Sequence, residues 1–462
     1  MDYTKIIETY RDEFYERLKE LIAIESIKDE KTVAPGAPFG KGCKDALDYM
    51  LDLAKKDGFK TINYDGYCGV IEYGEGQESI GVLAHLDLVT VGDEWVHDPF
   101  GAEMEKGFVF GRGVMDDKGP ALEAYFALKA LKANGFIPKR KIMLILGCDE
   151  ESGMECMHYY LKHGEIPTLG FTPDAEFPLI YGESGMLGFE ICGKISDCPV
   201  ISLDSGERSN IVLAKATALM RGADETQRCE FAYYLNAHHL EGSFEGNTLE
   251  FVGKAAHSAE VFKGVNAGLH LLNYVGISFD NHECRELYAM LADWRGSGLG
   301  IDMNGAYMGF LTMNIGKIKI EDDQIRITVD IRYPNDISAE ELTDIIKAKL
   351  NAKLDDFRLE NLDMSHRPLF VDPNSEFVKA LLNAYREMSG DIDTPPLAIR
   401  GGTYAKCFDN FVAFGPEFQE QHETDIVVGA IHQPNEAAYF DDMLKAMAIY
   451  MKAMNDLQDV KI

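Results

Sequence analysis

The 462-residue sequence lacks the cysteine pattern of a disulfide framework or a structural zinc cluster. Its nine cysteines are odd in number and scattered, and none form a Cys-x-x-Cys pair. No apolar run approaches the roughly 18 residues that a membrane helix needs. The stretch from Met1 to Glu30 is charged and helical in pattern, unlike a signal peptide. Together these absences predict a location in the reducing cytoplasm.

Positive charge is also scarce, with 45 basic against 77 acidic residues and a formal net charge of -32. Such a surface repels phosphate backbones and anionic lipids, so we expect neither nucleic acid nor a membrane as partner. Charged residues are 26% and hydrophobic residues 46% of the chain, as in an ordinary globular enzyme. The length exceeds what one simple core organises, which predicts two domains.

Strand and helix patterns alternate in the first part of the chain. Apolar positions at helical spacing predict an entry helix over residues 5–23. Three apolar stretches, Ser79–Leu86, Lys141–Cys148 and Thr168–Thr172, read as buried strands, and a helix is expected over 120–134 between the first two. This order predicts an α/β domain whose mostly parallel sheet is flanked by helices.

The middle of the chain has a different pattern. Residues 324–333 alternate strictly between apolar and polar side chains, and Ser338 with Glu341 predicts a capping box for a helix to about Leu350. We therefore expect an inserted α+β lid domain over residues 181–383. Residues 1–180 and 384–462 would form the two parts of the catalytic domain.

Six short acidic or histidine-bearing stretches carry the chemistry. Packing so many carboxylates together is costly unless cations neutralise them, so bound metal is the economical explanation. A set of imidazole and carboxylate donors suits zinc and, less selectively, manganese or cobalt. The stretches are Ala84-His85-Leu86-Asp87, Gly111 to Gly119 around Asp116-Asp117, Asp149-Glu150-Glu151-Ser152-Gly153, Thr172-Pro173-Asp174-Ala175-Glu176, Ala255-Ala256-His257-Ser258 and Ile431-His432-Gln433-Pro434-Asn435-Glu436.

Each stretch alone has an ordinary alternative. Asp116 and Asp117 could be a solvated turn or a helix cap, although their flanking glycines also suit the close-approach loop of a carboxylate that bridges two cations. Glu150 and Glu151 could be loop carboxylates in water, or one could bind metal while the other accepts a proton. A single histidine such as His257 could be a structural polar residue.

The ordered series of motifs resembles the co-catalytic metallopeptidases that include aminoacylases, acetylornithine deacetylase and succinyl-diaminopimelate desuccinylase, and within them the PepV-like bacterial dipeptidases. The resemblance covers essentially the full length. The dipeptidase branch is indicated by Thr172 to Pro178, Ser209-Asn210-Ile211-Val212, Gly264-Val265-Asn266-Ala267, Arg332-Tyr333-Pro334 and Gly401-Gly402-Thr403-Tyr404-Ala405.

The resemblance implies a role for each site residue. Two divalent ions, zinc by preference, would be held by His85, Asp116, Glu151, Asp174 and His432, with Asp116 bridging them. Glu150 would be the general base, and Asp87 would orient His85. The lid would contribute Asn210, His257 and Arg332, with His257 at the scissile carbonyl and Arg332 at the substrate carboxylate, which the backbone of Gly401 and Gly402 would also contact.

The activity that this implies is hydrolysis of the amide bond of dipeptides. Three alternatives remain open: an N-acyl amino-acid amidohydrolase (a deacetylase or desuccinylase), an aminotripeptidase, and a non-catalytic metal-dependent binding protein. The last would require loss of the base, and Glu150 is present. Because the middle region is long enough to cover the cleft of its own chain, we expect His257 and Arg332 to act in cis and a monomer to be active, although a homodimer is the alternative.

Overall fold

The computed structural model describes residues 1–420 and 422–461. The chain forms two compact units. Unit 1 comprises Met1–Gly182, Phe370–Leu397 and Gly402–Ile462, and unit 2 comprises Glu183–Leu369 and Ala398–Gly401. The chain returns to unit 1 at Phe370, earlier than the expected residue 384, because helix α10 (Glu376–Ser389) packs against the C-terminal helix of that unit.

A mixed sheet with a parallel centre organises unit 1. The order of its strands is β1-β2-β6-β3-β7-β22-β9-β20, and β21 pairs with β9. β3 is parallel to both β6 and β7, and β22 is parallel to β7. The strands of this sheet are β1 (Lys60–Tyr64), β2 (Cys68–Tyr73), β3 (Ser79–His85), β6 (Lys141–Gly147), β7 (Leu169–Thr172), β9 (Ile180–Glu183), β20 (Leu369–Phe370), β21 (Leu397–Ile399) and β22 (Phe411–Ala413).

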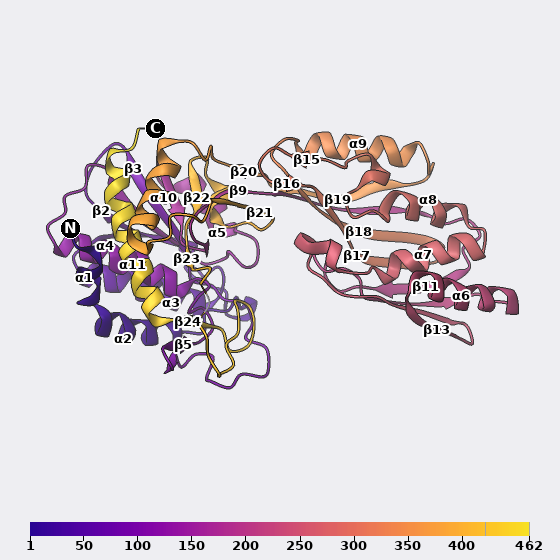
Figure 1. Ribbon diagram of the computed structural model, residues 1–462, viewed down its shortest axis with the longest axis horizontal. Coiled ribbons are helices and arrows are strands. Elements are labelled where there is room, and N and C mark those ends of the chain that lie inside the picture. The colour runs from indigo at the N-terminus through magenta and orange to yellow at the C-terminus, as the bar shows by residue number, and fades with distance from the viewer. Residues whose placement is uncertain (421, 462) are drawn as a thin grey trace. The chain divides into compact units, whose positions relative to one another are not determined.

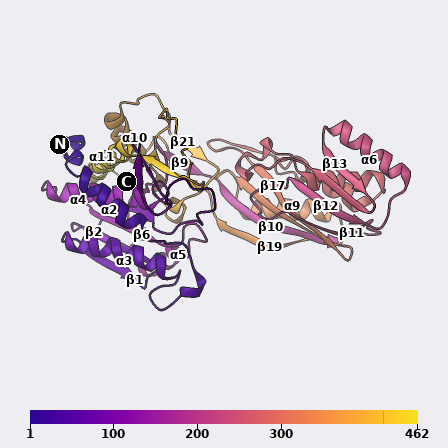
Figure 2. The ribbon, with the colours of Figure 1, turned by 90° about the horizontal axis from the view of Figure 1, so that it is seen from below.

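Helices flank this sheet. α4 contacts β3 and β6 and packs on α11, which also contacts α1 and α10, whereas α3 and α5 contact β2 (Figure 1, Figure 2). β3 and β6 are almost wholly buried, which explains their continuous apolar sequences. The helices are α1 (Tyr3–Glu8), α2 (Arg11–Ile22), α3 (Lys41–Lys56), α4 (Lys118–Ala133), α5 (Glu155–His163), α10 and α11 (Phe440–Asp456), with the 3-10 turns η1 (Glu30–Thr32), η4 (Tyr404–Cys407) and η5 (Leu457–Asp459).

Short strands complete unit 1. β24 pairs with β5, which pairs with β4, and β23 pairs with β8. The parallel bridge between β23 and β8 joins the segment after β22 to the segment after β7. The strands are β4 (Glu103–Glu105), β5 (Phe108–Phe110), β8 (Ala175–Glu176), β23 (Pro416–Glu417) and β24 (Ala437–Tyr439).

An antiparallel sheet with helices packed on it forms unit 2. Its strand order is β13-β14-β12-β11-β17-β18-β10-β19, and one apolar cluster joins these strands to the helices. The elements are β10 (Gly185–Lys194), β11 (Val200–Ser205), β12 (Lys215–Met220), α6 (Glu225–His238), β13 (Glu241–Glu245), β14 (Thr248–Val252), η2 (Ser258–Lys263), α7 (Ala267–Ser278), α8 (His282–Leu291), η3 (Ser297–Leu299), β15 (Asn304–Gly305), β16 (Gly309–Phe310), β17 (Thr312–Glu321), β18 (Gln324–Tyr333), α9 (Ala339–Asn351) and β19 (Arg358–His366).

The predicted fold class, an α/β catalytic part plus an α+β insertion, is confirmed. The expected capping box of Ser338 and Glu341 is present at α9. One local expectation is wrong: the single entry helix over 5–23 is two helices, α1 and α2. The hydroxyl of Thr9 donates to the carbonyl of Ile6 at 2.7 Å where α1 ends, and such side-chain bonds compete with the helix backbone. No helix within the described ranges combines the length and apolar character needed to cross a membrane.

Candidate metal centre

The strand order of unit 1 explains why distant motifs meet. His85 is the last residue of β3, Glu150 and Glu151 follow β6, and Asp174 follows β7. β3 lies between β6 and β7 and is parallel to both, so the carboxyl ends of all three strands reach one edge of the sheet. Ligands of open α/β sheets bind at this edge.

Five predicted side chains converge there in two groups of three. Nε2 of His85 lies 2.9 Å from Oδ1 of Asp116, and Nε2 of His432 lies 2.9 Å from Oδ2 of Asp116 and 3.0 Å from Oε1 of Glu151. Within each group the ligand atoms lie within 4.8 Å of one another. Asp116 belongs to both groups and turns one oxygen to each. The groups are His85, Asp116 and Asp174, and Asp116, Glu151 and His432.

Asp87 contacts two parts of the metal centre, the turn of Glu150 and Glu151 and the ring of His85. Its two carboxylate oxygens each accept a backbone N–H, one from Glu150 and one from Glu151, both at 3.1 Å. Nδ1 of His85 lies 3.1 Å from the backbone carbonyl oxygen of Asp87 and 3.5 Å from its Oδ1. Nδ1 is thereby occupied behind the ring, and Nε2 is the nitrogen that faces Asp116, an arrangement typical of an oriented metal ligand.

The loop that carries Asp116 is shaped by Glu436, a residue to which sequence reasoning gave no role. This carboxylate accepts the backbone N–H groups of Gly113, Met115 and Asp116 at 3.0, 3.1 and 3.3 Å, and it pairs with Nη1 of Arg112 at 2.5 Å. Glu436 is fully buried. Its place at the end of the motif that contains His432 was the one indication in the sequence that Glu436 belongs to the site. Nothing local in the sequence shows that it accepts hydrogen bonds from a loop more than three hundred residues away.

The carboxylates of this centre raise the pKa values of its two histidines, His85 and His432. Burial alone would lower the pKa of His85, but the carboxylates of Asp116 and Asp87 outweigh it and hold the pKa well above its ordinary value. Hydrogen bonds to Asp116 and Glu151 raise the pKa of His432 to about 10. Burial would raise the pKa of Asp116, yet its two histidine partners keep it low. The centre therefore favours cations in contact with Asp116.

Two further carboxyls are pushed toward their neutral forms. Burial, together with the charges of Glu151, Asp116 and Asp87, raises the pKa of Glu150 to about 8, against the opposing effect of His85. Burial and the charges of Asp117 and Asp116 raise the pKa of Asp174 well above normal. Excess negative charge is thus the dominant electrostatic feature, and divalent cations are the ligands that would relieve it.

The donor set fits two metal ions. Each group offers one imidazole and carboxylate oxygens, with Asp116 shared, and this combination suits zinc and also manganese or cobalt. A third group, Glu190, Cys192 and Glu360 in unit 2, is different because the guanidinium of Arg326 already pairs with both carboxylates. The candidate metal centre is therefore the pair of groups in unit 1.

Unit 2 brings together three of the predicted substrate residues. An antiparallel bridge joins Ile211 to His257, and the N–H of Ser258 donates to the carbonyl of Asn210 at 2.9 Å. Nδ1 of His257 accepts the N–H of Ala259 at 3.2 Å, which leaves the ring proton on Nε2. Burial and the nearby charge of Arg332 lower the pKa of His257, so the imidazole is neutral at pH 7 and can donate from Nε2.

Arg332 lies in a hollow of unit 2 whose basic side chains outnumber its two aspartates, Asp330 and Asp363. A cavity of about 450 Å³ is lined by Asn210 and Arg332 together with Arg208, Lys317 and other residues. Nε and Nη2 of Arg332 donate to Oδ2 of Asp330 at 3.3 and 3.0 Å, which orients the guanidinium. The alternation predicted for residues 324–333 is present in β18, and Asp330 and Arg332 near the end of its polar face are buried. Arg208 and Lys317 were not predicted, because isolated basic residues carry no motif.

The glycine pair lies where the chain passes from one unit to the other. Gly401 is the last residue of unit 2, and Gly402 begins the final part of unit 1. The residue after the pair, Thr403, caps η4 by accepting the N–H of Ala405 at 3.2 Å. All five predicted metal ligands belong to unit 1, whereas Asn210, His257, Arg332 and Gly401 belong to unit 2.

Comparison with known proteins identifies relatives of the whole chain. The model of Peptidase family M20/M25/M40 matches residues 81–456. A Staphylococcus haemolyticus protein named "Putative dipeptidase" is 35% identical over 472 residues, with 98% of each chain covered. Among solved structures, human carnosine dipeptidase 1 has a TM-score of 0.57 at 16% identity, covering 99% of this chain and 98% of that chain. A Staphylococcus aureus tripeptidase has a TM-score of 0.58 at 12% identity, covering 97% and 98%.

Proposed function

We propose that this chain, which belongs to Peptidase family M20/M25/M40, is a metal-dependent dipeptidase that hydrolyses the amide bond of dipeptides. The observation that carries the proposal is Asp116, whose two oxygens face two separate donor groups. A relative named as a dipeptidase that is 35% identical over 98% of each chain supports the choice of substrate.

The metal ligands in this proposal are His85 and Asp174 for one ion, Glu151 and His432 for the other, and Asp116 for both. Zinc is the expected metal, because nitrogen and oxygen donors in small number suit it best. When bound, two such cations supply Lewis acidity, which lowers the pKa of water and polarises the amide carbonyl.

Glu150 is the proposed general base. It lies three residues after the end of β6, Asp87 accepts its backbone N–H, and burial raises its pKa to about 8. Cations beside it would lower that pKa toward neutrality, where a carboxylate can accept a proton and release it again. Glu150 takes the proton of the attacking water and then delivers it to the leaving amine.

His257 is the proposed donor to the oxyanion. Its Nδ1 is occupied by the N–H of Ala259, so Nε2 carries the proton and the neutral ring can donate it in a hydrogen bond. A donor aimed at the oxygen where charge develops lowers the barrier.

Arg332 and Asn210 are the proposed partners of the substrate's terminal carboxylate. The guanidinium of Arg332 has five N–H groups. Only its Nε and Nη2 each donate a hydrogen bond to Asp330, so other N–H groups can bind a carboxylate. We also expect backbone N–H groups of Gly401 and Gly402 to contact this carboxylate. Fixing the carboxylate at a set place limits how long a peptide can be, which favours dipeptides over longer substrates.

A substrate panel tests the proposal. Metal-free enzyme is refilled with zinc, manganese or cobalt and assayed with free-amine dipeptides, tripeptides and N-acetyl amino acids. The proposal expects the highest kcat/KM for dipeptides. Preference for N-acetyl amino acids would indicate an amidohydrolase, preference for tripeptides an aminotripeptidase, and no turnover with any metal a binding protein.

A cytoplasmic, monomeric enzyme is the remaining part of the proposal. All nine cysteines are free thiols, seven of them buried, which suits a reducing compartment. The acidic net charge of -32 argues against nucleic acid as a partner.

A further inference from the structure

A cavity of unit 1, which we call the acidic pocket, adjoins the metal centre. Its volume is about 380 Å³, within the usual range of small-ligand sites. Met115 lines it and immediately precedes Asp116, and Gly429 and Ala430 line it shortly before His432. Glu417, another lining residue, interacts electrostatically with Asp116. The acidic pocket therefore lies beside the reacting groups without including any proposed metal ligand.

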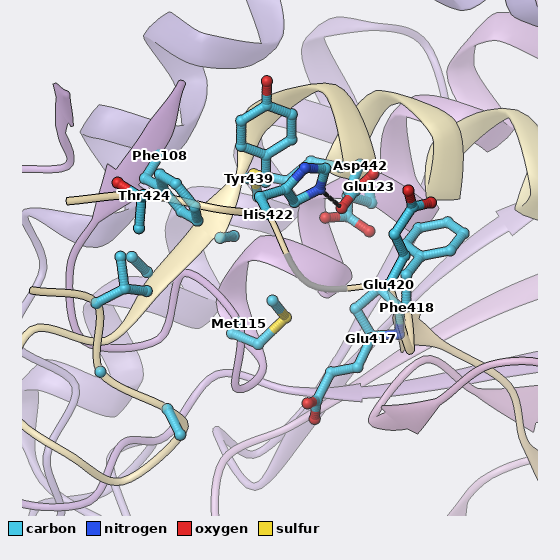
Figure 3. A pocket seen from close by; sticks show the side chains of 17 residues that line it. Phe108, Met115, Glu123, Glu417, Phe418, Glu420, His422, Thr424, Tyr439 and Asp442 are labelled. Carbon is cyan, nitrogen blue, oxygen red and sulfur yellow. Dashed lines mark hydrogen bonds and ion pairs between the residues drawn. The ribbon is translucent and has the colours of Figure 1, made fainter. Parts of the chain in front are cut away.

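Apolar and aromatic side chains form much of its wall. Phe108, Tyr439 and Phe418 line it, with Met115 near the middle of the view in Figure 3. The ring of His422 stacks on Tyr439, with centroids 3.7 Å apart and planes 23° apart. A wall of this kind suits a chain of methylene groups and also the flank of a cation, because aromatic faces attract positive charge.

Carboxylates dominate the polar part of the acidic pocket. Glu123, Glu417, Glu420 and Asp442 line it, and no lysine or arginine is among its described lining residues. Nε2 of His422 lies 2.6 Å from Oδ2 of Asp442, and Figure 3 shows Glu123 beside this pair. The carboxyl groups of the lining thus outnumber its one histidine, and burial with the charge of Glu176 raises the pKa of Glu417 among them to about 7.

Glu123 gives an independent sign of a missing partner. Its side chain is 1% exposed, and its Oε2 has no hydrogen-bond partner. A buried polar atom without a partner is costly, and a buried carboxylate is stable only when a cation or donors face it. Burial and the charges of Asp117 and Asp442 raise the pKa of Glu123 well above its ordinary value, and a cation facing the carboxylate would oppose that rise.

A metal ion does not suit this geometry. Among the described residues, no three ligand atoms of Glu123, His422 and Asp442 form one of the groups that lie within 4.8 Å of one another. The cavity is also larger than a single ion requires. An organic cation with a flexible apolar stem fits both the aromatic walls and the acidic end.

We propose that the acidic pocket binds the side chain of a lysine or arginine residue of the dipeptide substrate, which rests on the proposed dipeptidase function. The methylene stem lies along Phe108, Met115 and Tyr439, and the ammonium or guanidinium group meets Glu123 and Asp442. Charge-assisted hydrogen bonds of this kind favour the cationic side chain over an uncharged one of equal length by about tenfold or more.

Kinetics on matched substrates test this proposal. Lys-Ala and Ala-Lys are compared with norleucyl-alanine and alanyl-norleucine, which have the same stem without the charge. In the wild type, kcat/KM is expected to be higher for the lysine dipeptide than for its norleucine counterpart in at least one of the two residue orders. The difference should arise mainly from a lower KM. In Glu123→Gln and Asp442→Asn, this lysine-to-norleucine ratio falls toward one.

Asp441→Asn is the control, because it removes the same charge next to Asp442 but from an exposed side chain that pairs with Arg11 outside the pocket. Its lysine-to-norleucine ratio should remain that of the wild type. If wild-type enzyme hydrolyses both substrates with equal kcat/KM, the proposal is overturned while the dipeptidase function stands.

Binding of a small amine separates the pocket from the activity. n-Pentylamine, a mimic of the lysine side chain, should raise the melting temperature of the wild type more than n-pentanol does, and Glu123→Gln should lose this difference. If no dipeptide is hydrolysed, the proposed dipeptidase function is wrong, and the thermal shift still tests whether the acidic pocket binds a cationic side chain. Equal shifts with amine and alcohol in the wild type would overturn the proposed binding of a cation.

Discussion

The neighbouring residues Glu150 and Glu151 have different partners, although their sequence context is the same. Asp87 accepts the backbone N–H of each, which fixes the turn that carries both side chains. Glu151 contacts His432 in the second donor group, whereas Glu150 belongs to neither group. This difference supports the proposed roles of Glu151 as a metal ligand and of Glu150 as the general base.

Substituting each glutamate should reveal this division. Glu150→Gln is expected to keep both metals and to lose about 10²–10⁴-fold in kcat, because only proton transfer is removed. Glu151→Gln should bind less metal, since a carboxylate ligand is lost. Metal content by atomic absorption, measured beside steady-state kinetics, checks both results. Equal metal loss in the two variants contradicts the assignment.

Glu436 should act on the metal centre through the loop of Asp116. Glu436→Gln removes the charge that pairs with buried Arg112 and weakens three backbone hydrogen bonds. Leaving a buried charge unpaired costs about 3–5 kcal/mol, so a clear fall in melting temperature is expected. Metal affinity should fall as well, and titration calorimetry measures it. Glu20→Gln, which removes an exposed partner of Arg17, should change neither quantity.

At the scale of elements, the sequence predicted the strands that build the metal centre almost to the residue. β3, β6 and β7 have continuous apolar sequences because both faces of a parallel sheet are covered. The break between α1 and α2 escaped prediction, since it depends on the local bond of Thr9. The return to unit 1 at Phe370 depends on the packing of α10 against α11, which periodicity cannot reveal.

The candidate site was predictable to the extent that its chemistry is local. Histidine and paired acids at strand ends indicate metal ligands, and the resemblance assigned them to two ions. The role of Glu436 and the composition of the acidic pocket arise only when the segment after β22 folds back beside α4. Glu123 looks like an ordinary helix residue in the sequence, and only its burial shows that it needs a partner.

The helix α7 carries a histidine that should make unit 2 sensitive to acid. Burial and the nearby His238 lower the pKa of His270 to about 4, and Nδ1 of His270 lies 3.1 Å from the hydroxyl of Tyr234. The unfolded chain therefore takes up this proton first, near the ordinary value of about 6.5. Stability contributed by neutral His270 is fully present above that pH and is lost as the pH falls toward 4.

Replacing His270 should flatten this part of the pH profile. The difference in melting temperature between pH 7 and pH 5 is expected to be smaller in His270→Gln than in the wild type, by a few degrees. Thermal unfolding followed by circular dichroism at both pH values measures it. His282→Gln, at an exposed position of unit 2, is the control and should keep the wild-type difference. An unchanged difference in His270→Gln would refute the assignment.

At the scale of the whole molecule, cations at the metal centre should stabilise the fold. The chain has 32 more acidic than basic side chains, and several of its acids are gathered around Asp116. A ligand that binds only the folded state raises stability in proportion to the logarithm of its concentration over Kd. Chelation should therefore lower the melting temperature, and added zinc should restore it. Asp116→Asn should respond much less to either treatment.

The cis arrangement of the two units is the most demanding expectation. We propose that His257 and Arg332 of unit 2 serve the metal centre of their own chain. Closure of one unit on the other would then expel water, bring Nε2 of His257 to the carbonyl oxygen and fix the carboxylate against Arg332.

Mixing inactive His257→Ala protein with inactive Glu150→Gln protein distinguishes a histidine that acts in its own chain from one donated across a dimer. In cis, every chain lacks one essential group and the mixture stays inactive. If histidine is donated across a dimer, mixed dimers contain one complete site, and up to about a quarter of wild-type activity returns when subunits exchange freely. Sedimentation of the wild type at assay concentration provides the control, because a monomer that is active leaves no partner from which the histidine could come.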